Sequence, residues 1–154
     1  MIQRVQSIYL FLSMVLMILI LFFPIARLIG GENQTFLLNF SGIFKTNPDG
    51  QELIIGAIPL AIILIAIPVI SFVTIYLYKN RMLQIRLTIF NILLMLGSTG
   101  LMYYYIRHGQ GKLDADVYYS FPIVLPLVSA ILTYLAFRGI KKDEEIVRSY
   151  DRIR

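Results

Sequence analysis

The chain of 154 residues contains no cysteine and a single histidine, His108. The absence of cysteine excludes disulfides, thiol catalysis and cysteine-ligated metal sites. One histidine excludes a metal site built from several histidines of one chain. Charged residues make up only 15% of the chain against 58% hydrophobic residues, a balance that excludes an ordinary soluble globular domain.

Charge is also missing locally, because four long stretches contain no Asp, Glu, His, Lys or Arg. They are Val5–Ala26, Leu53–Tyr78, Leu87–Ile106 and Val117–Phe137. A helix needs about 20 apolar residues to cross a hydrocarbon layer of ~30 Å. We therefore predict an all-α membrane protein with a bundle of four transmembrane helices. The whole chain, 1–154, is then a single integral membrane domain, with spans at about 6–26, 53–78, 83–106 and 118–138 and a helical tail at 139–154.

Positive charge is distributed unevenly around these stretches. Ten of the 14 Lys and Arg residues lie before the first stretch, between the second and third, or after the fourth. The positive-inside rule then predicts that both termini are cytoplasmic. The same rule explains the formal net charge of +5 better than nucleic-acid binding does. Tyrosines lie near both ends of the spans, as membrane-interface anchors do, although Tyr103–Tyr105 can also be read as a ligand-stacking site.

The connection between the first two stretches carries a strand pattern. Phe36, Leu38 and Phe40 alternate with other residues, and a turn is expected at Ser41-Gly42. Asn47-Pro48-Asp49-Gly50 is a second turn signal that returns the chain to the membrane. The sequence thus favours a small β-hairpin in the first extracytoplasmic loop, which must pack on helices or lipid because an isolated hairpin is marginally stable.

Polar residues inside the spans are uncharged. Proton relays, ion pathways and intramembrane proteases usually need ionisable groups at membrane depth, so these classes are disfavoured. Small and polar residues let helices approach closely. They recur on one face of the second, third and fourth spans, while the first is bulky and is expected to be more exposed to lipid or a partner. The third-span face holds Thr88, Asn91, Met95, Ser98 and Met102, and the fourth-span face holds Ser129, Thr133 and Ala136.

The charged tail has the pattern of a helix. Ile146, Val147, Tyr150 and Ile153 recur at helical spacing, and Lys141–Glu145 is an oppositely charged pair four residues apart. Such a helix can lie on the membrane surface or bind a partner, or it can be a solvated extension of the fourth span.

The two ends of the chain resemble a known family. Met1-Ile2-Gln3-Arg4-Val5-Gln6-Ser7-Ile8-Tyr9 at the start, and Lys142 to Ser149 followed by Asp151 to Arg154 at the end, are similar to a bacterial family of four-span membrane proteins that is known only as a domain of unknown function. The resemblance implies a protein of the inner membrane of a Gram-negative bacterium. It implies no catalytic residue.

Three functions fit these observations. The first is a non-enzymatic accessory or structural subunit of a membrane assembly, which contacts lipid and a membrane-protein partner or a second copy but no nucleic acid. The second is an oligomeric carrier or channel for a small neutral or lipidic solute, lined by Asn91, Ser98 and Thr133. The third is a lipid-headgroup enzyme that uses Asp114 and Asp116. A metal site of His108 with these two acids lacks any fixed geometry, so we favour the first function and expect no catalytic, cofactor or metal site.

Overall fold

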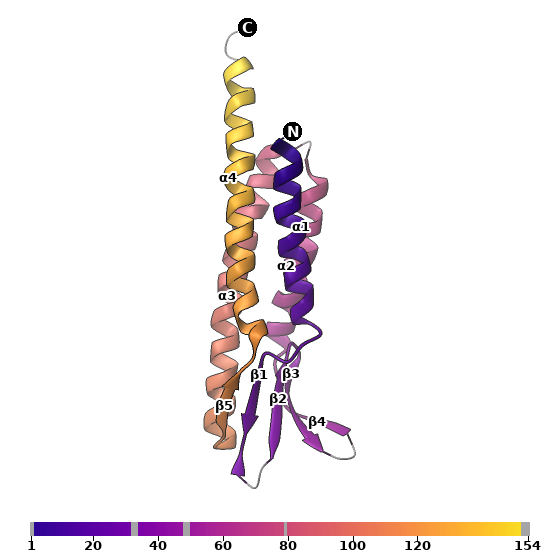
Figure 1. Ribbon diagram of the computed structural model, residues 1–154, viewed down its shortest axis with the longest axis vertical. Helices are drawn as coiled ribbons and strands as arrows, with labels where there is room; N and C mark the ends of the chain where they lie inside the picture. Colours follow the sequence, from indigo (N-terminus) through magenta and orange to yellow (C-terminus); the bar gives the residue numbers. More distant parts are fainter. Residues whose placement is uncertain (1, 32–33, 48–49, 79, 152–154) are drawn as a thin grey trace.

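The computed structural model of the chain describes residues 2–31, 34–47, 50–78 and 80–151, and the side chains of 5–31, 34–47, 50–78 and 80–147. Four helices stand side by side, and a five-stranded sheet extends from one end of them (Figure 1). Helix α1 (Ile2–Ile20) begins, and helix α4 (Leu125–Asp151) ends, at the end away from the sheet. There α4 projects beyond the other three helices.

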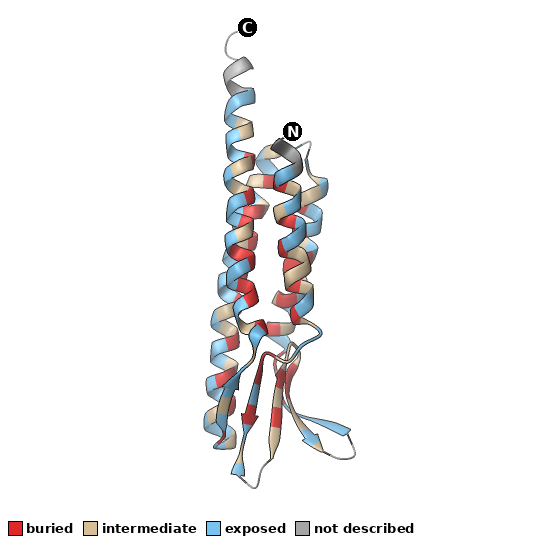
Figure 2. Cartoon of the chain, in the orientation of Figure 1, coloured by how far each residue is buried: buried red, intermediate tan, exposed pale blue. Residues whose placement is uncertain are grey.

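The helices pack in cyclic order. Helix α1 contacts α2 (Ile58–Tyr76), α2 contacts α3 (Arg81–Leu113), α3 contacts α4, and α4 closes the ring on α1. A short 3-10 helix, Phe121–Val124, leads into α4. The buried side chains gather on the facing surfaces, while most of the outward surface of the helices is exposed and apolar (Figure 2).

Three of these helices are long and apolar enough to span a membrane: Ile58–Tyr76, Arg81–Leu113 and Phe121–Val147. The prediction of four spans is therefore wrong. The remaining apolar helical segment, Val5–Ile20, is shorter than a span, with a length of about 24 Å at the usual rise per residue. A turn after Ile20 and the proline at position 24 end α1, although the apolar sequence continues to Ala26.

The prediction of an all-α bundle with at most a small hairpin is also wrong, because one end of the molecule is a five-stranded antiparallel sheet. Its strands are β1 (Ala26–Ile29), β2 (Thr35–Asn39), β3 (Gly42–Asn47), β4 (Gly50–Gly56) and β5 (Asp116–Tyr119). The strand order is β4-β3-β2-β1-β5. The expected hairpin is real, since β2 pairs with β3 next to the turn at Phe40-Ser41, but it forms the middle of a larger sheet. The middle of the second turn signal, Pro48-Asp49, lies outside the described residues.

Strand β4 occupies residues that the sequence assigned to the second span. The apolar run there starts at Leu53, yet the backbone is extended as far as Gly56. Helix α2 begins only at Ile58, with Pro59 in its first turn, where a proline stabilises a helix start. A short run of β-branched residues before a glycine and a proline is compatible with a strand as well as with a helix. Here the segment is a strand because it pairs with β3.

Helix α3 joins the two parts of the molecule. Its final segment, 107–113, lies beyond the predicted span at 83–106 but continues the helix beside the sheet. The buried face of the sheet, which includes Leu28, Phe36 and Ile43, lies against this helix. The contact is close, because a β-carbon at Gly109 would lie 2.5 Å from Ile43 Cδ1 and 3.3 Å from Leu28 Cδ2. The sheet is therefore packed on α3 and not loosely tethered.

The packing of α1 differs from the sequence prediction. Ser13, in the middle of α1, is fully buried, and its Oγ lies 2.9 Å from Thr133 Oγ1 of α4. The Ser13 hydroxyl also donates to the Ser129 carbonyl at 3.3 Å. Helix α1 is thus fixed against α4, where the sequence suggested exposure to lipid. The buried faces predicted for α3 and α4 are confirmed, from Thr88 to Met102 and from Ser129 to Ala136.

Candidate functional site

The face of the sheet that points away from α3 carries one residue from each strand in a continuous row. Register pairs Tyr118 with Arg27, Arg27 with Leu37, Leu37 with Phe44, and Phe44 with Leu53. Directly paired residues lie on the same face of a sheet. These five residues form what we call the outer row: Tyr118, Arg27, Leu37, Phe44 and Leu53.

The outer row is partly accessible, because Leu37 and Phe44 are half-buried and the other three members are exposed. Tyr118 is 56% exposed and Leu53 is 54% exposed, and Arg27 between the strands is exposed as well. Tyrosine, phenylalanine and arginine are the side chains most enriched at protein interfaces. Strand β4, at the edge of the sheet, is exposed at most of its positions (Figure 2). Its pairing with β3 shifts register between Ile43 and Phe44 of β3. The outer row therefore has the composition of a protein-binding surface.

A second feature is the polar interior of the helices. The buried face of α3 presents Gln84, Thr88, Asn91 and Ser98 at spacings of three, four and seven residues. Most of these groups are satisfied locally. Gln84 donates to the Thr74 carbonyl at 3.1 Å, and the hydroxyls of Thr88 and Ser98 donate to carbonyls of the preceding turn.

Asn91 is the exception. Its side-chain amide donates to Ser71 Oγ of α2 at 2.7 Å, while its Oδ1 is buried without a hydrogen-bond partner among the described residues. An unpaired buried carbonyl oxygen costs about 1–3 kcal/mol. Asn91 is only 1% exposed, so no bulk solvent reaches this oxygen. The group is available to a ligand or a water that enters the interior.

At the end away from the sheet, Asp143 of α4 connects two other helices. Its carboxylate accepts a hydrogen bond from Gln6 Nε2 of α1 at 2.7 Å, and its backbone carbonyl accepts one from Arg81 Nη1 of α3 at 2.9 Å. A small pocket of about 20 Å³ lies between these groups and Gln84. This volume holds about one water molecule, so the cluster joins helices and has no room for a substrate.

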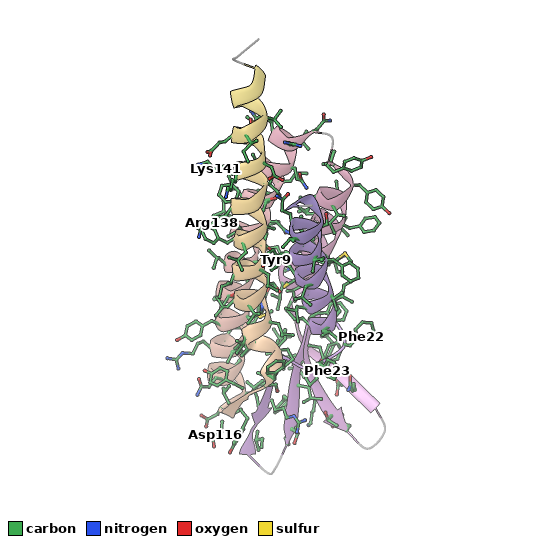
Figure 3. The ribbon with its side chains drawn as sticks, turned by 45° about the horizontal axis from the view of Figure 1, so that its top comes forward. Tyr9, Phe22, Phe23, Asp116, Arg138 and Lys141 are labelled. Atoms are coloured by element: carbon green, nitrogen blue, oxygen red, sulfur yellow. The ribbon has the colours of Figure 1, made fainter. Side chains whose placement is uncertain are left out.

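Aromatic side chains surround the junction between the helices and the sheet. Phe22 and Phe23 lie where α1 meets the sheet (Figure 3). On α3, Arg107 lies 5.7 Å from the Tyr103 ring centroid, and Tyr104 stacks on His108 at 5.9 Å. These pairs are one helical turn apart on an exposed surface, an arrangement typical of membrane-interface anchoring.

Comparison with known families identifies the chain. Residues 2–153 match the family described as Domain of unknown function (DUF4293). The chain belongs to this family. No curated protein matches it. The resemblance drawn from the end motifs is thus confirmed at the level of the family, and membership in DUF4293 assigns no activity or residue role.

The structure separates the residues of the weaker hypotheses. Asp116 lies on the exposed surface of β5 (Figure 3). Asp114 ends α3 in a left-handed conformation with φ 44°, whereas His108 stacks on Tyr104. Within the described ranges, no group of three His, Asp or Glu residues could hold a metal ion. Of the three tyrosines at 103–105, Tyr103 and Tyr104 are exposed and Tyr105 packs on the core, so they form no common ligand face.

The residues of the solute-path hypothesis are closer together. Asn91 and Ser98 share the buried face of α3, and the Thr133 hydroxyl approaches the sulfur of Met95, between them on the helix, at 3.7 Å. Sequence reasoning missed the outer row completely. Its members are scattered from position 27 to 118, and only the alternation around Leu37 gave a signal.

Proposed function

We propose that this member of DUF4293 is an integral protein of the bacterial inner membrane with both termini in the cytoplasm. The end where α1 begins and α4 ends carries Arg81, Arg86, Arg138, Lys141 and Lys142. Figure 3 places Arg138 and Lys141 on this side and Asp116 at the opposite extremity. Cationic residues are retained on the cytoplasmic side, so the sheet faces the extracytoplasmic space.

We further propose that the protein is a non-enzymatic accessory subunit of a membrane assembly and that it binds its partner through the outer row. The observation that carries this proposal is a rigid sheet, packed on α3 at Gly109, whose opposite face presents Tyr118, Arg27 and Leu53 to the surroundings. A protein that only anchors in the membrane needs no such sheet. Large apolar side chains that are exposed outside the lipid favour binding to another protein.

The partner is a protein and not a nucleic acid. The outer row contains a single cation among aromatic and aliphatic side chains, whereas nucleic-acid sites depend on several phosphate-neutralising cations. A second copy of the chain and a different membrane protein are both compatible with this chemistry, and the mass of the crosslinked product distinguishes them.

Photo-crosslinking in cells tests the proposal. A photoreactive residue at Leu53, in the outer row, should give a specific crosslinked product, and the same residue at Lys112 should not. Lys112 is exposed at the same end of the molecule but lies on α3, away from the outer row. Arg27→Glu should remove the Leu53 product, because it places an acid in the middle of the row. Absence of any protein product from Leu53, together with purification of the protein as a solitary chain in mild detergent, contradicts the proposal.

A second function, transport of a small neutral or lipidic solute, is favoured by one observation: the buried Asn91 Oδ1 without a partner. Uptake into liposomes tests it. Asn91→Leu should abolish uptake and leave the Leu53 crosslink intact. It should not unfold the protein, because it removes one hydrogen bond to Ser71 and also removes the unpaired oxygen. Unchanged uptake in Asn91→Leu, or none in the unsubstituted protein, rejects this function.

A further inference from the structure

An open groove lies between the start of α3 and the part of α4 that projects beyond the other helices. It is a shallow surface groove with a volume of about 680 Å³. The lining residues are Asn80, Arg81, Met82, Leu83, Arg86 and Val147. The groove lies at the opposite end of the molecule from the outer row, so its role is independent of docking there.

The groove is positively charged. Among the residues that the structure describes, two of the six that line the groove are arginines and none is acidic. Arg81 donates to the Asp143 backbone carbonyl, an uncharged group, through Nη1. In the part of the chain whose side chains the structure describes, no acidic side chain forms an ion pair with Arg81 or Arg86; the ion pair seen at this end joins Lys141 and Glu145.

The same groove has an apolar part. Met82 is 49% exposed, Leu83 is 46% exposed and Val147 is 45% exposed. These apolar side chains contribute nothing to the binding of a small hydrated anion. A molecule that has both an anionic group and a hydrocarbon part contacts all six residues favourably.

The level of the groove along α3 indicates which molecule this is. Arg86 directly precedes Leu87–Ile106, a stretch without Asp, Glu, His, Lys or Arg that is about 30 Å long as a helix. This length equals the thickness of the hydrocarbon core, so in the membrane orientation proposed above, on which this inference rests, Arg86 lies at the depth of the lipid phosphates. Basic pockets beside membrane helices bind anionic headgroups.

We propose that this groove is a binding site for an anionic phospholipid of the adjacent leaflet. The phosphate is held by the guanidinium groups of Arg81 and Arg86, whose planar donors match phosphate oxygens in pairs. Met82, Leu83 and Val147 contact the glycerol backbone and the upper acyl chains. Phosphatidylcholine, which has no net charge, lacks the attraction that the two arginines supply.

Native mass spectrometry of the full chain in mild detergent, titrated with phosphatidylglycerol or phosphatidylcholine, tests the site. We expect tighter binding of phosphatidylglycerol and a loss of about fivefold in its affinity with Arg86→Gln, since one cation near an anionic surface contributes roughly 1 kcal/mol. Arg86→Lys should keep most of this preference. Arg86 is exposed, and circular dichroism verifies the fold of each variant.

The matched control is Arg138→Gln, which removes the same charge from an exposed position on α4 outside the groove. Its phosphatidylglycerol affinity should stay within twofold of the unsubstituted protein. An equal loss in Arg138→Gln and Arg86→Gln would attribute binding to diffuse surface charge and overturn the proposal. Equal affinity for the two lipids in the unsubstituted protein would overturn it as well.

Discussion

Replacing Gly42 with alanine should destabilise the protein because of the way β3 pairs with β4. Gly42 has a φ of +156°, and a β-carbon there would lie against the backbone carbonyl oxygen of Ile55 and 2.8 Å from Leu53 Cδ1. A backbone oxygen that belongs to the strand ladder cannot move away without breaking pairing. A side chain at such a φ costs about 1–2 kcal/mol, and one lost ladder hydrogen bond costs about 1 kcal/mol more.

Gly56 provides the matched control. It is the register partner of Gly42 on β4, and a β-carbon there would meet no atom within 4 Å. Gly56→Ala should therefore be neutral or slightly stabilising, because alanine restricts the unfolded chain. The expected difference between the variants is about 2–4 kcal/mol, which corresponds to roughly 4–16 °C in the midpoint of thermal unfolding for a chain of this size.

Thermal unfolding in detergent, followed by circular dichroism, measures this difference. If residues 53–78 formed one membrane helix, as the sequence suggested, Gly56→Ala would strengthen that helix by about 1 kcal/mol and Gly42→Ala would act in a loop with little effect. Equal midpoints for Gly42→Ala and the unsubstituted protein would refute the pairing of β3 with β4 and the reasoning built on the sheet.

Two further experiments test the contacts that hold the sheet and the helices. Gly109→Ala places a β-carbon 2.5 Å from the terminal methyl group of Ile43, and it should lower stability by up to about 2 kcal/mol in the same unfolding assay, because the helix preference of alanine offsets part of the overpacking cost. Gly111→Ala, in open space on the same helix, should raise stability by up to about 1 kcal/mol. The opposite order would contradict close packing of Ile43 on α3. A double-mutant cycle of Ser13→Ala and Thr133→Val should give a coupling free energy of about 0.6 kcal/mol, which is the average for hydrogen bonds between membrane helices. If the two changes in unfolding free energy are strictly additive, this contact does not stabilise the protein.

The parts of the fold that the sequence predicted are those set by local periodicity. The face of α3 from Thr88 to Met102 was predicted from spacings of three and four residues, and each of its members is buried. The pair Lys141–Glu145 was predicted from the same geometry, and the two charged atoms lie 4.0 Å apart. Such patterns depend on neighbours within two turns of one helix, so no knowledge of the tertiary structure is needed.

The sheet could not be predicted because one of its pairings joins distant segments. Ala26 pairs with Tyr119, and both residues lie at the margins of apolar stretches that also fit membrane helices. Strand β1 begins at the last residue of the first predicted span, and β5 includes the first two residues of the fourth. The partner of each strand lies far away in the sequence, so the hydropathy of either segment alone favours a helix.

The same long-range pairing explains why the outer row was missed while Asn91 was not. Asn91 is conspicuous as a carboxamide in an apolar stretch, which is a property of its immediate neighbours. The outer row exists only when register aligns Arg27 with Tyr118 on one side and with Leu37 on the other. A surface of this kind is specified by the sheet and not by any one segment of the sequence.

The outer row and the basic groove lie at the two ends of α3, which is 33 residues and therefore about 50 Å long. They share no residue, and effects at sites more than about 10 Å apart usually add. Combining Arg27→Glu with Arg86→Gln should thus remove the Leu53 crosslink as completely as Arg27→Glu alone, and lower phosphatidylglycerol affinity as much as Arg86→Gln alone. If instead the Arg27→Glu substitution changes lipid affinity by itself, α3 transmits the state of the sheet along its length to the groove. The two surfaces would then belong to a single switch, and the assumption that they act independently would fail.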